Sequence, residues 1–394
     1  MVMKKRKGSG RKKKVPPKLF LTILSAFLAC IVLLILYISF MYRSDRILSP
    51  LYEEIHSSAG DLNESIKNID STIYESLYKS GVQEKDIFFL NVQPRHQNGH
   101  VWDYAEILVN CPDNRFALNI QKIINHDLGV LGKDIRLRKE KGPEGKIICQ
   151  VFAKGLPTHK IILRVGGQRP RIKDARPRIA IIIDDLGYAS DTDYLFFQLE
   201  LPLSFSVLPC GPFTQSIVQK ANEKGRELLL HLPMEPKNYP TVKPGPGALF
   251  LSMDAHRIRE VLDQDLRQIK GVRGVNNHMG SRFTEDREKM LIVLNELKQK
   301  NLFFIDSRTT KDTVGLDLAK DIGLPSARRR VFLDNSLSPK AMNIQMERLL
   351  NMARHLGVAI GIGHPYKETY ELLEQYSPKI QSEFQIVPVS ELVS

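Results

Sequence analysis

The stretch IAIIIDDLGY, residues 179–188, decides the fold of this 394-residue chain. Five apolar residues are followed directly by Asp184 and Asp185. A short, continuous apolar run predicts a strand that is buried on both faces, as in a parallel sheet covered by helices. The two carboxylates then lie at the carboxyl end of that strand. The stretch therefore predicts a parallel sheet with acidic groups along one edge.

Further apolar runs follow, and amphipathic helical stretches separate them. The strand-like runs are 203–208, 228–230, 271–275, 302–305, 331–333, 358–362 and 385–389. Helical spacing of apolar residues marks 213–224, 255–269, 286–300 and 341–356. This alternation over 179–394 predicts an α/β domain, a (β/α) barrel of about seven units. A doubly wound open sheet is the alternative.

Polar residues stand directly after six of these strands. They are Asp184-Asp185, His231, Asn276-Asn277-His278, Asp306, Asp334-Asn335 and His364. A lone Asp or His at a strand end is more often a helix cap or a surface group. In a β/α barrel, however, the carboxyl ends of all strands meet on one face, where catalytic residues lie. Six strands with polar ends therefore indicate one shared site.

The residue types at these strand ends suit a divalent metal ion. Asp185, His231 and His278 provide a carboxylate and two imidazoles, and a catalytic zinc typically has three protein ligands and one open position. Asp184 is then the candidate general base, and His364 the candidate group that protonates a leaving group. A turn or helix cap at Asp184-Asp185, and a capping role for His364, are the alternatives.

The motifs IAIIIDDLGY, HLPMEP, GVNNHMGSRFT, FFIDSRTT and GIGHPY occur in this order, and together they resemble the divergent polysaccharide deacetylase family. The resemblance covers roughly residues 179–394. It implies a distorted (β/α) barrel and a metal-dependent hydrolase that releases acetate from acetylated sugars. It also implies that Asp184 is the base, Asp185 a metal ligand and His364 the group that assists the leaving group.

The better-studied deacetylases of the wider superfamily take both metal histidines from one H-x-x-x-H helix. This spacing does not occur in 179–394, where His231 and His278 follow separate strands instead. Four further residues near the motifs are candidates for substrate binding: Asn277, Arg282, Asp306 and Arg308. Asn277 alternatively orients His278, and the two arginines alternatively pair with Asp306 or Asp334. The run 328–330 (RRR) is expected to be a solvated loop.

The formal net charge of +13 is concentrated at the N-terminus. Residues 1–18 contain nine Lys or Arg and no acid, so the remainder carries only +4. The uncharged residues 19–42 follow, and 24 of them are enough to cross a membrane core of about 30 Å. The basic tail is then expected in the cytoplasm and the C-terminus outside it. A cleaved signal peptide, a lipoprotein and a nucleic-acid-binding tail are weaker alternatives.

Residues 51–166 are expected to form a small α+β domain, and 167–178 a Gly- and Pro-containing linker. Helical spacing covers 47–80 and 116–126, and strand-like runs occur at 87–92, 104–109, 146–152 and 161–165. No C-x-x-C motif occurs, which excludes a zinc ribbon or a thioredoxin-like site. Cys111 and Cys149 are expected either to pair outside the cytoplasm or to be buried free thiols.

The sequence thus predicts a single-pass membrane protein with an extracytoplasmic, zinc-dependent deacetylase-like hydrolase domain. Its expected partner is a cell-envelope polysaccharide or a peptidoglycan-type glycan, and no nucleic acid. The second hypothesis belongs to another class: a glycan-binding envelope protein that keeps the cavity without turnover.

Overall fold

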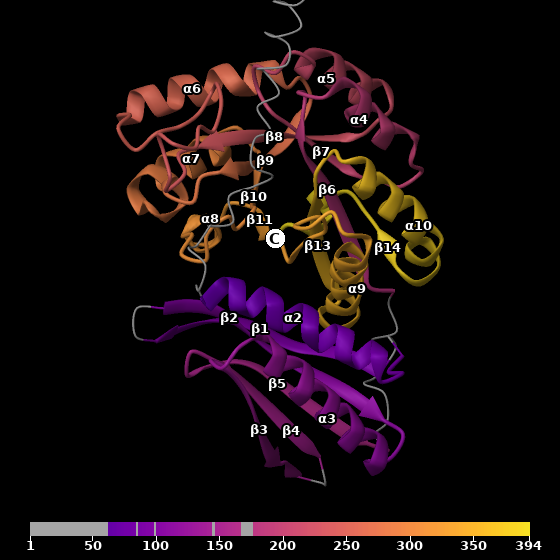
Figure 1. The fold of residues 1–394 in the computed structure, drawn as a ribbon. Helices are drawn as coiled ribbons and strands as arrows, with labels where there is room; N and C mark the ends of the chain where they lie inside the picture. Colours follow the sequence, from indigo (N-terminus) through magenta and orange to yellow (C-terminus); the bar gives the residue numbers. More distant parts are fainter. Residues whose placement is uncertain (1–61, 84–85, 98–99, 144–145, 167–175) are drawn as a thin grey trace, which may run out of the picture. The chain divides into compact units, whose positions relative to one another are not determined.

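Two sheets organise the residues that the computed structural model describes, 62–394 without 84–85, 98–99, 144–145 and 167–175 (Figure 1). These residues belong to one compact unit. The expected basic tail 1–18 and membrane span 19–42 lie outside the described residues, as does most of the expected linker. Among the helices of the described part, none is both long and apolar enough to cross a membrane.

The first sheet has five strands in the order β1-β2-β5-β4-β3. β2 and β5 are parallel, and the other neighbours are antiparallel. Cys111 and Cys149 are free, buried thiols in this sheet. The elements are α2 (Leu62–Lys79), β1 (Ile87–Gln97), β2 (His100–Cys111), α3 (Asn114–Leu131), β3 (Ile135–Lys141), β4 (Ile147–Ala153) and β5 (Leu156–Val165).

The second sheet has nine strands, and all of its pairings are parallel. Its strands are β6 (Arg178–Leu186), β7 (Ser204–Val207), β8 (Glu227–Met234), β9 (Val272–Met279), β10 (Phe303–Asp306), β11 (Ser326–Arg328), β12 (Val331–Phe332), β13 (Val358–Gly363) and β14 (Gln385–Ile386). The order β11-β10-β9-β8-β7-β6-β13-β12 follows the chain from β6 to β10. A doubly wound sheet would instead reverse direction near its first strand. The curled parallel sheet is therefore consistent with the predicted barrel.

Helices between the strands cover the outer face of this sheet (Figure 1). They are α4 (Ser190–Leu195), α5 (Thr214–Glu223), α6 (Ala255–Gln268), α7 (Arg287–Gln299), α8 (Gly315–Asp321), α9 (Pro339–Leu356) and α10 (Lys367–Glu383). Asp254 and Asp286 begin α6 and α7 by accepting hydrogen bonds from Arg257 N and Lys289 N. Such side-chain caps satisfy amide groups that the first helical turn leaves without partners.

The two ends of the sheet are joined by a single short segment. Only Arg329 and Arg330 separate β11 from β12, and their amides donate to Asp306 O and Ile360 O on opposite sides. The expectation of a solvated loop at 328–330 is therefore wrong. The guanidinium of Arg329 stacks on the Phe332 ring, 3.6 Å from its centroid, and donates to two loop carbonyls. An arginine can serve in this way because its long stem is apolar and its head is planar.

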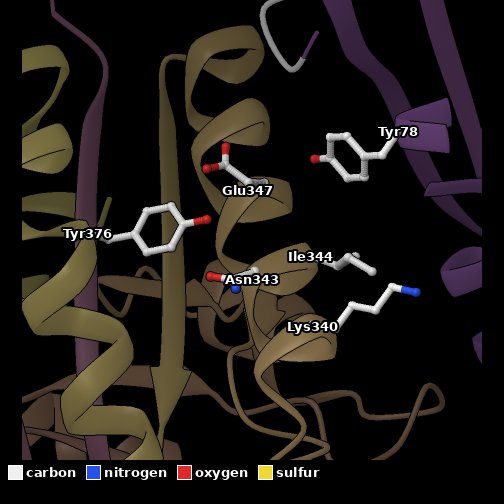
Figure 2. A pocket seen from close by; sticks show the side chains of 6 residues that line it. All are labelled: Tyr78, Lys340, Asn343, Ile344, Glu347 and Tyr376. Atoms are coloured by element: carbon white, nitrogen blue, oxygen red, sulfur yellow. The ribbon is translucent and has the colours of Figure 1, made fainter. Parts of the chain in front are cut away.

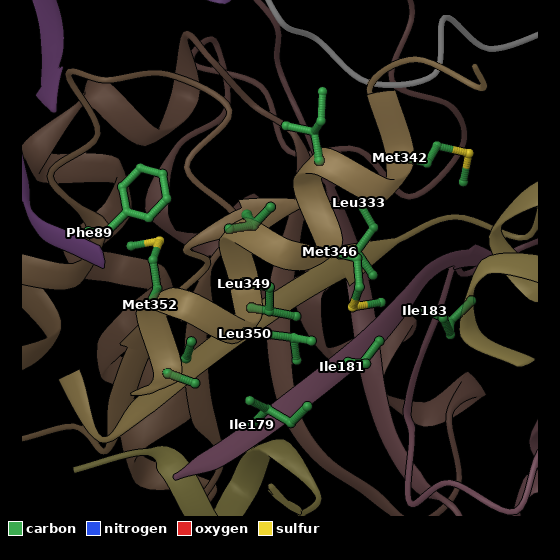
Figure 3. Packing of buried hydrophobic residues seen from close by; sticks show 14 of the residues in the cluster. Phe89, Ile179, Ile181, Ile183, Leu333, Met342, Met346, Leu349, Leu350 and Met352 are labelled. Carbon is green, nitrogen blue, oxygen red and sulfur yellow. The ribbon is translucent and has the colours of Figure 1, made fainter. Parts of the chain in front are cut away.

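Two-residue alternation along β6 divides its side chains between the two faces. Ile179, Ile181 and Ile183 belong to the outer cluster, in which α9 packs over the sheet (Figure 3). Ala180 and Ile182 belong to the inner cluster, which fills the curl. The other members of the inner cluster are Leu229, Phe303, Ile305, Phe332, Ile360, Ile362 and Val389. The lower part of the curl is thus an apolar core, as in other β/α barrels.

The end of the chain covers the amino ends of the strands. β14 pairs with the start of β6, and Val389 N donates to Ser204 Oγ at the start of β7. Ser326 N, at the start of β11, donates to Ser394 O. The apolar core fills the inside of the curled sheet, and the C-terminal segment covers the amino ends of its strands. The polar residues therefore lie at the other end of the curl, where the strands have their carboxyl ends.

Helix α2 reaches α9 through a buried charged contact. Asp70 on α2 accepts from His159 Nε2 at 2.8 Å and from Arg348 Nη1 at 2.9 Å. Burial alone would raise the pKa of Asp70, but the Arg348 guanidinium and the hydrogen bonds from Arg348 and His159 hold it well below its usual range. Paired in this way, the carboxylate can remain charged away from water.

A cavity of about 540 Å³ lies among residues of α2, α9 and α10 (Figure 2). It is lined by Tyr78, Lys340, Asn343, Ile344, Glu347 and Tyr376. None of these six residues follows one of the polar strand ends. The cavity is therefore separate from the site that the sequence predicts.

Gly274 provides a test of the inner packing. It lies in β9 against the Phe303 ring, and a Cβ added there would overlap that ring. We expect Gly274→Ala to lower the free energy of unfolding by about 1–3 kcal/mol, because overpacking a filled core displaces its neighbours. Gly129→Ala, in α3, meets no atom within 4 Å and should instead stabilise by up to about 1 kcal/mol. Urea denaturation of both variants measures this, and equal stabilities would contradict the packing described.

Candidate active site

The same alternation brings polar side chains together above the apolar core. Asp184, His231, Asn276, Ser307 and His364 each stand two residues beyond an inward-facing position of their strand. All five are at most 2% exposed. Successive side chains of a strand point to opposite faces, so residues in this phase converge inside the curl. Five strands thus contribute to one buried polar layer.

Asp185 is out of phase with this row, and the backbone compensates. The pairing of β6 with β7 shifts register between Ile183 and Leu186, as at a β-bulge. Asp185 also has a φ of +58°, in the left-handed region. Bulges often redirect side chains near functional sites, and a non-glycine residue in this region costs of order 1 kcal/mol or more. The irregular backbone brings Asp185 next to the inward-facing histidines.

Asp185, His231 and His278 bring three potential ligand atoms together. His231 Nε2 lies 3.0 Å from Asp185 Oδ1, and His278 Nδ1 lies 2.9 Å from the same oxygen. The two imidazole nitrogens are 3.2 Å apart. These three residues are a group of the kind that can hold a metal ion. The structure therefore brings together the three ligands predicted from sequence.

The three ligand atoms, Asp185 Oδ1, His231 Nε2 and His278 Nδ1, form a triangle whose edges match those around a tetrahedral metal ion. Asp185 Oδ1 is buried and accepts no well-formed hydrogen bond, although two ring nitrogens lie about 3 Å away. Around a zinc ion with ligands at about 2.0–2.1 Å, neighbouring tetrahedral ligand atoms are about 3.3 Å apart. The observed edges of 2.9–3.2 Å are close to this value. Burial would raise the pKa of Asp185, but the neighbouring His278 and His231 hold it well below its usual range.

Asp184 lies next to the triangle but is not part of it. Its Oδ2 is 3.6 Å from His231 Nε2, and both of its oxygens accept from Asn276 Nδ2, at 2.9 and 3.0 Å. Burial raises the pKa of Asp184, while the nearby His231 and His364 oppose this. A carboxylate in this position is within reach of the same small space as the three ligand atoms.

His364 is held by a fully buried carboxylate. Its Nδ1 lies 2.9 Å from Asp334 Oδ1, and Asp334 Oδ2 accepts from His364 N and from Thr369 Oγ1. Burial would lower the pKa of His364, but the Asp334 carboxylate raises it to about 9. The ring also stacks on Phe332, with centroids 5.8 Å apart. Fixed in this way, the imidazole carries a proton near neutral pH.

The candidate substrate-binding residues are already engaged in contacts within the protein. Arg282 donates to Glu235 at 2.9 Å, while half of its side chain stays exposed. Asp306 accepts from Arg308 N, Thr313 Oγ1 and Leu316 N, and so closes its own loop. The sequence left open that Arg282 pairs with Asp306 or Asp334. In the structure its partner is Glu235 instead.

Asn277 spans the ends of β9 and β10. Its Oδ1 accepts from Ser307 N, and its Nδ2 donates to Met279 O and Thr309 Oγ1. The amide therefore holds the loops that carry the site. Arg308 is partly exposed beside a cavity of about 290 Å³ that Asp306 and Arg328 also line. Substrate binding by these four residues stays a prediction.

Sequence reasoning gave no role to two residues that the structure places at the centre of the site. Asp334 was noted as a strand-end acid and as an alternative partner of Arg282 or Arg308, and its pairing with His364 depends on the adjacency of β12 and β13. Asn276 was noted only within its motif, although it precedes His278 by two residues and so shares its face. Strand phase was the signal available for Asn276. Strand phase also applies to Asp334, two residues beyond the inward-facing Phe332, but nothing in the sequence pairs it with His364.

Comparison with known proteins places this domain in a family. Residues 181–393 match the family model described as divergent polysaccharide deacetylase. An uncharacterized protein of Haemophilus influenzae is 34% identical over 218 residues, which are 55% of this chain and 77% of that protein. The uncharacterized protein YibQ of Escherichia coli is 31% identical over 217 residues, 55% of this chain and 67% of that protein.

A solved structure agrees in fold. The crystal structure of an uncharacterized protein from Agrobacterium tumefaciens is similar with a TM-score of 0.54 and 26% identity. It covers 57% of this chain and 92% of that chain. The family match extends from within β6, close to the Asp pair, to the penultimate residue, and so contains the whole site. On this evidence the chain belongs to the divergent polysaccharide deacetylase family.

Proposed function

We propose that this protein is a zinc-dependent hydrolase that removes acetyl groups from a cell-envelope glycan. One observation carries the proposal: the triangle of Asp185, His231 and His278 has a second carboxylate, Asp184, beside it and a buried, Asp-paired His364 in the same polar layer. Metal ligands, a base and an acid are the groups that amide or ester hydrolysis requires. Membership of the family supports this class of reaction.

In this mechanism Asp185, His231 and His278 hold the cation, which would act as a Lewis acid that polarises the acetyl carbonyl and makes water more acidic. Asp184 takes the proton from the attacking water. His364 donates a proton to the departing amine or alkoxide, and Asp334 keeps its ring in place. Asp185 is partly exposed and the other groups are buried, which strengthens their electrostatic interactions with the reacting atoms.

The N-terminal sequence supports a location for the substrate. We propose that residues 19–42 anchor the chain in a membrane, with 1–18 in the cytoplasm and the described domain outside it. The basic tail and the uncharged stretch support this arrangement. An anchored domain reaches an envelope polysaccharide or peptidoglycan-type glycan without diffusing away.

The reaction is tested by measuring acetate released from isolated envelope glycans by the purified full chain, together with its metal content. We expect about one zinc per chain and acetate release that falls at least 100-fold in Asp184→Asn, because a positioned base commonly contributes 10²–10⁴-fold. Arg287→Gln, which changes an exposed ion pair on α7, is the control and should retain activity.

The alternative function, glycan binding without turnover, gives a different result. Glycan would then bind equally to the wild-type chain and to Asp184→Asn, and neither would release acetate. Acetate release by Asp184→Asn at the wild-type rate would contradict the role of this residue.

The pairing of His364 with Asp334 predicts a pH dependence. A histidine whose pKa is raised stays protonated until the pH passes that value, so acetate release should persist to about pH 9 and fall above it. Asp334→Asn removes the charge that raises the pKa, and the alkaline limit should move towards the ordinary value of about 6.5. Thr369→Val removes only a donor to Asp334 and should keep the limit near that of the wild type. A pH–rate profile for the three chains measures this, and equal limits would contradict it.

A further inference from the structure

Asn276 is a fully buried amide at the centre of the polar layer. Its Nδ2 lies 2.9 and 3.0 Å from the two oxygens of Asp184 and 3.1 Å from Ser307 Oγ. Its Oδ1 accepts from Ser206 Oγ and lies 3.1 Å from His231 Nδ1. The amide therefore has one end on the proposed base and the other on a proposed metal ligand.

The surroundings allow only one orientation of this amide. An amide has two N–H donors at one end and an acceptor oxygen at the other. Turning it over would place its oxygen against the Asp184 carboxylate and its amino group against His231 and Ser206. An unfavourable contact between two acceptors in a buried layer is costly. The two oxygens of Asp184, which both accept from Nδ2, thus fix which end of Asn276 faces His231.

This orientation determines the form of His231. In a neutral imidazole, one nitrogen carries hydrogen and the other has a free lone pair. Because Nδ1 faces the oxygen of Asn276, Nδ1 carries a hydrogen, and Nε2 is the nitrogen left to offer a lone pair to a metal ion. Nε2 is the atom that lies 3.0 Å from Asp185 Oδ1 within the triangle. A hydrogen bond to the distal nitrogen commonly sets the tautomer and orientation of a metal-binding histidine.

We infer that Asn276 is a positioning residue with two separable tasks, a step that rests on the proposed function. Its oxygen holds His231 in the tautomer that can bind the metal ion. Its amino group holds the Asp184 carboxylate beside the triangle. Asn276 thereby couples the placement of the base to that of the ligand.

Two substitutions separate these tasks. Asn276→Leu has a similar volume and neither donor nor acceptor, so His231 loses its partner. Asn276→Asp keeps an acceptor for His231 Nδ1 but replaces the donors to Asp184 with a second negative charge. We expect zinc affinity to fall 10- to 100-fold in Asn276→Leu and to stay within about threefold of wild type in Asn276→Asp. Acetate release per bound zinc should fall at least tenfold in both.

The measurement is a zinc titration of the metal-stripped full chain against a chromophoric chelator, with thermal unfolding of the metal-free chain recorded beside it. Ser204→Ala is the matched control. Ser204 is fully buried on β7, two residues before Ser206, and donates to Glu227 at the opposite end of the strand. It should lower the unfolding temperature while leaving zinc affinity unchanged.

The outcomes distinguish this inference from the function on which it rests. Wild-type zinc affinity in Asn276→Leu would overturn the inference alone. Equal losses of affinity in both Asn276 variants, in proportion to lost thermal stability, would also overturn it, because a merely structural role predicts that pattern. A wild-type chain that binds no zinc would instead overturn the proposed function, and the inference with it.

Discussion

The site depends on the two-residue alternation of parallel strands around a curled sheet. Ala180 and Ile182 face the apolar interior of the curl, and the next inward position on β6 is Asp184. Because the neighbouring strands share this phase, each passes from core to polar layer at its carboxyl end. The apolar core below and the helices outside hold the strands in register. The polar layer therefore stands directly on the apolar core.

Asp185 shows what the site requires beyond regular structure. In an unbroken strand it would point away from His231 and His278, and only the bulge and its φ of +58° bring it to them. Met279 and Arg308, at the ends of β9 and β10, also have positive φ values. Backbone strain of this kind persists where the surrounding structure enforces it, and it is common at functional sites. The departure from regular geometry is thus part of the evidence that the triangle has a function.

Apolar patterning made much of the fold predictable. The run 179–183 became β6, and the runs at 228–230 and 271–275 became β8 and β9, which extend further because their polar ends are buried as well. β11 was missed because the run of three arginines at 328–330 gives no apolar strand pattern, although this segment joins the two ends of the sheet. The grouping of Asp185, His231 and His278 could be predicted because the carboxyl ends of parallel strands meet at one end of the curled sheet. The partners Asp334 and Asn276 could not be assigned, because hydrogen bonds between strands depend on their order and register.

The central claim is that Asp185, His231 and His278 bind one metal ion. Anomalous diffraction at the zinc absorption edge, from crystals of the protein grown with zinc, tests it directly. If these residues bind the ion, a single strong peak lies about 2.0–2.1 Å from Asp185 Oδ1, His231 Nε2 and His278 Nδ1. The absence of a peak there, or a peak held by other residues only, would contradict it.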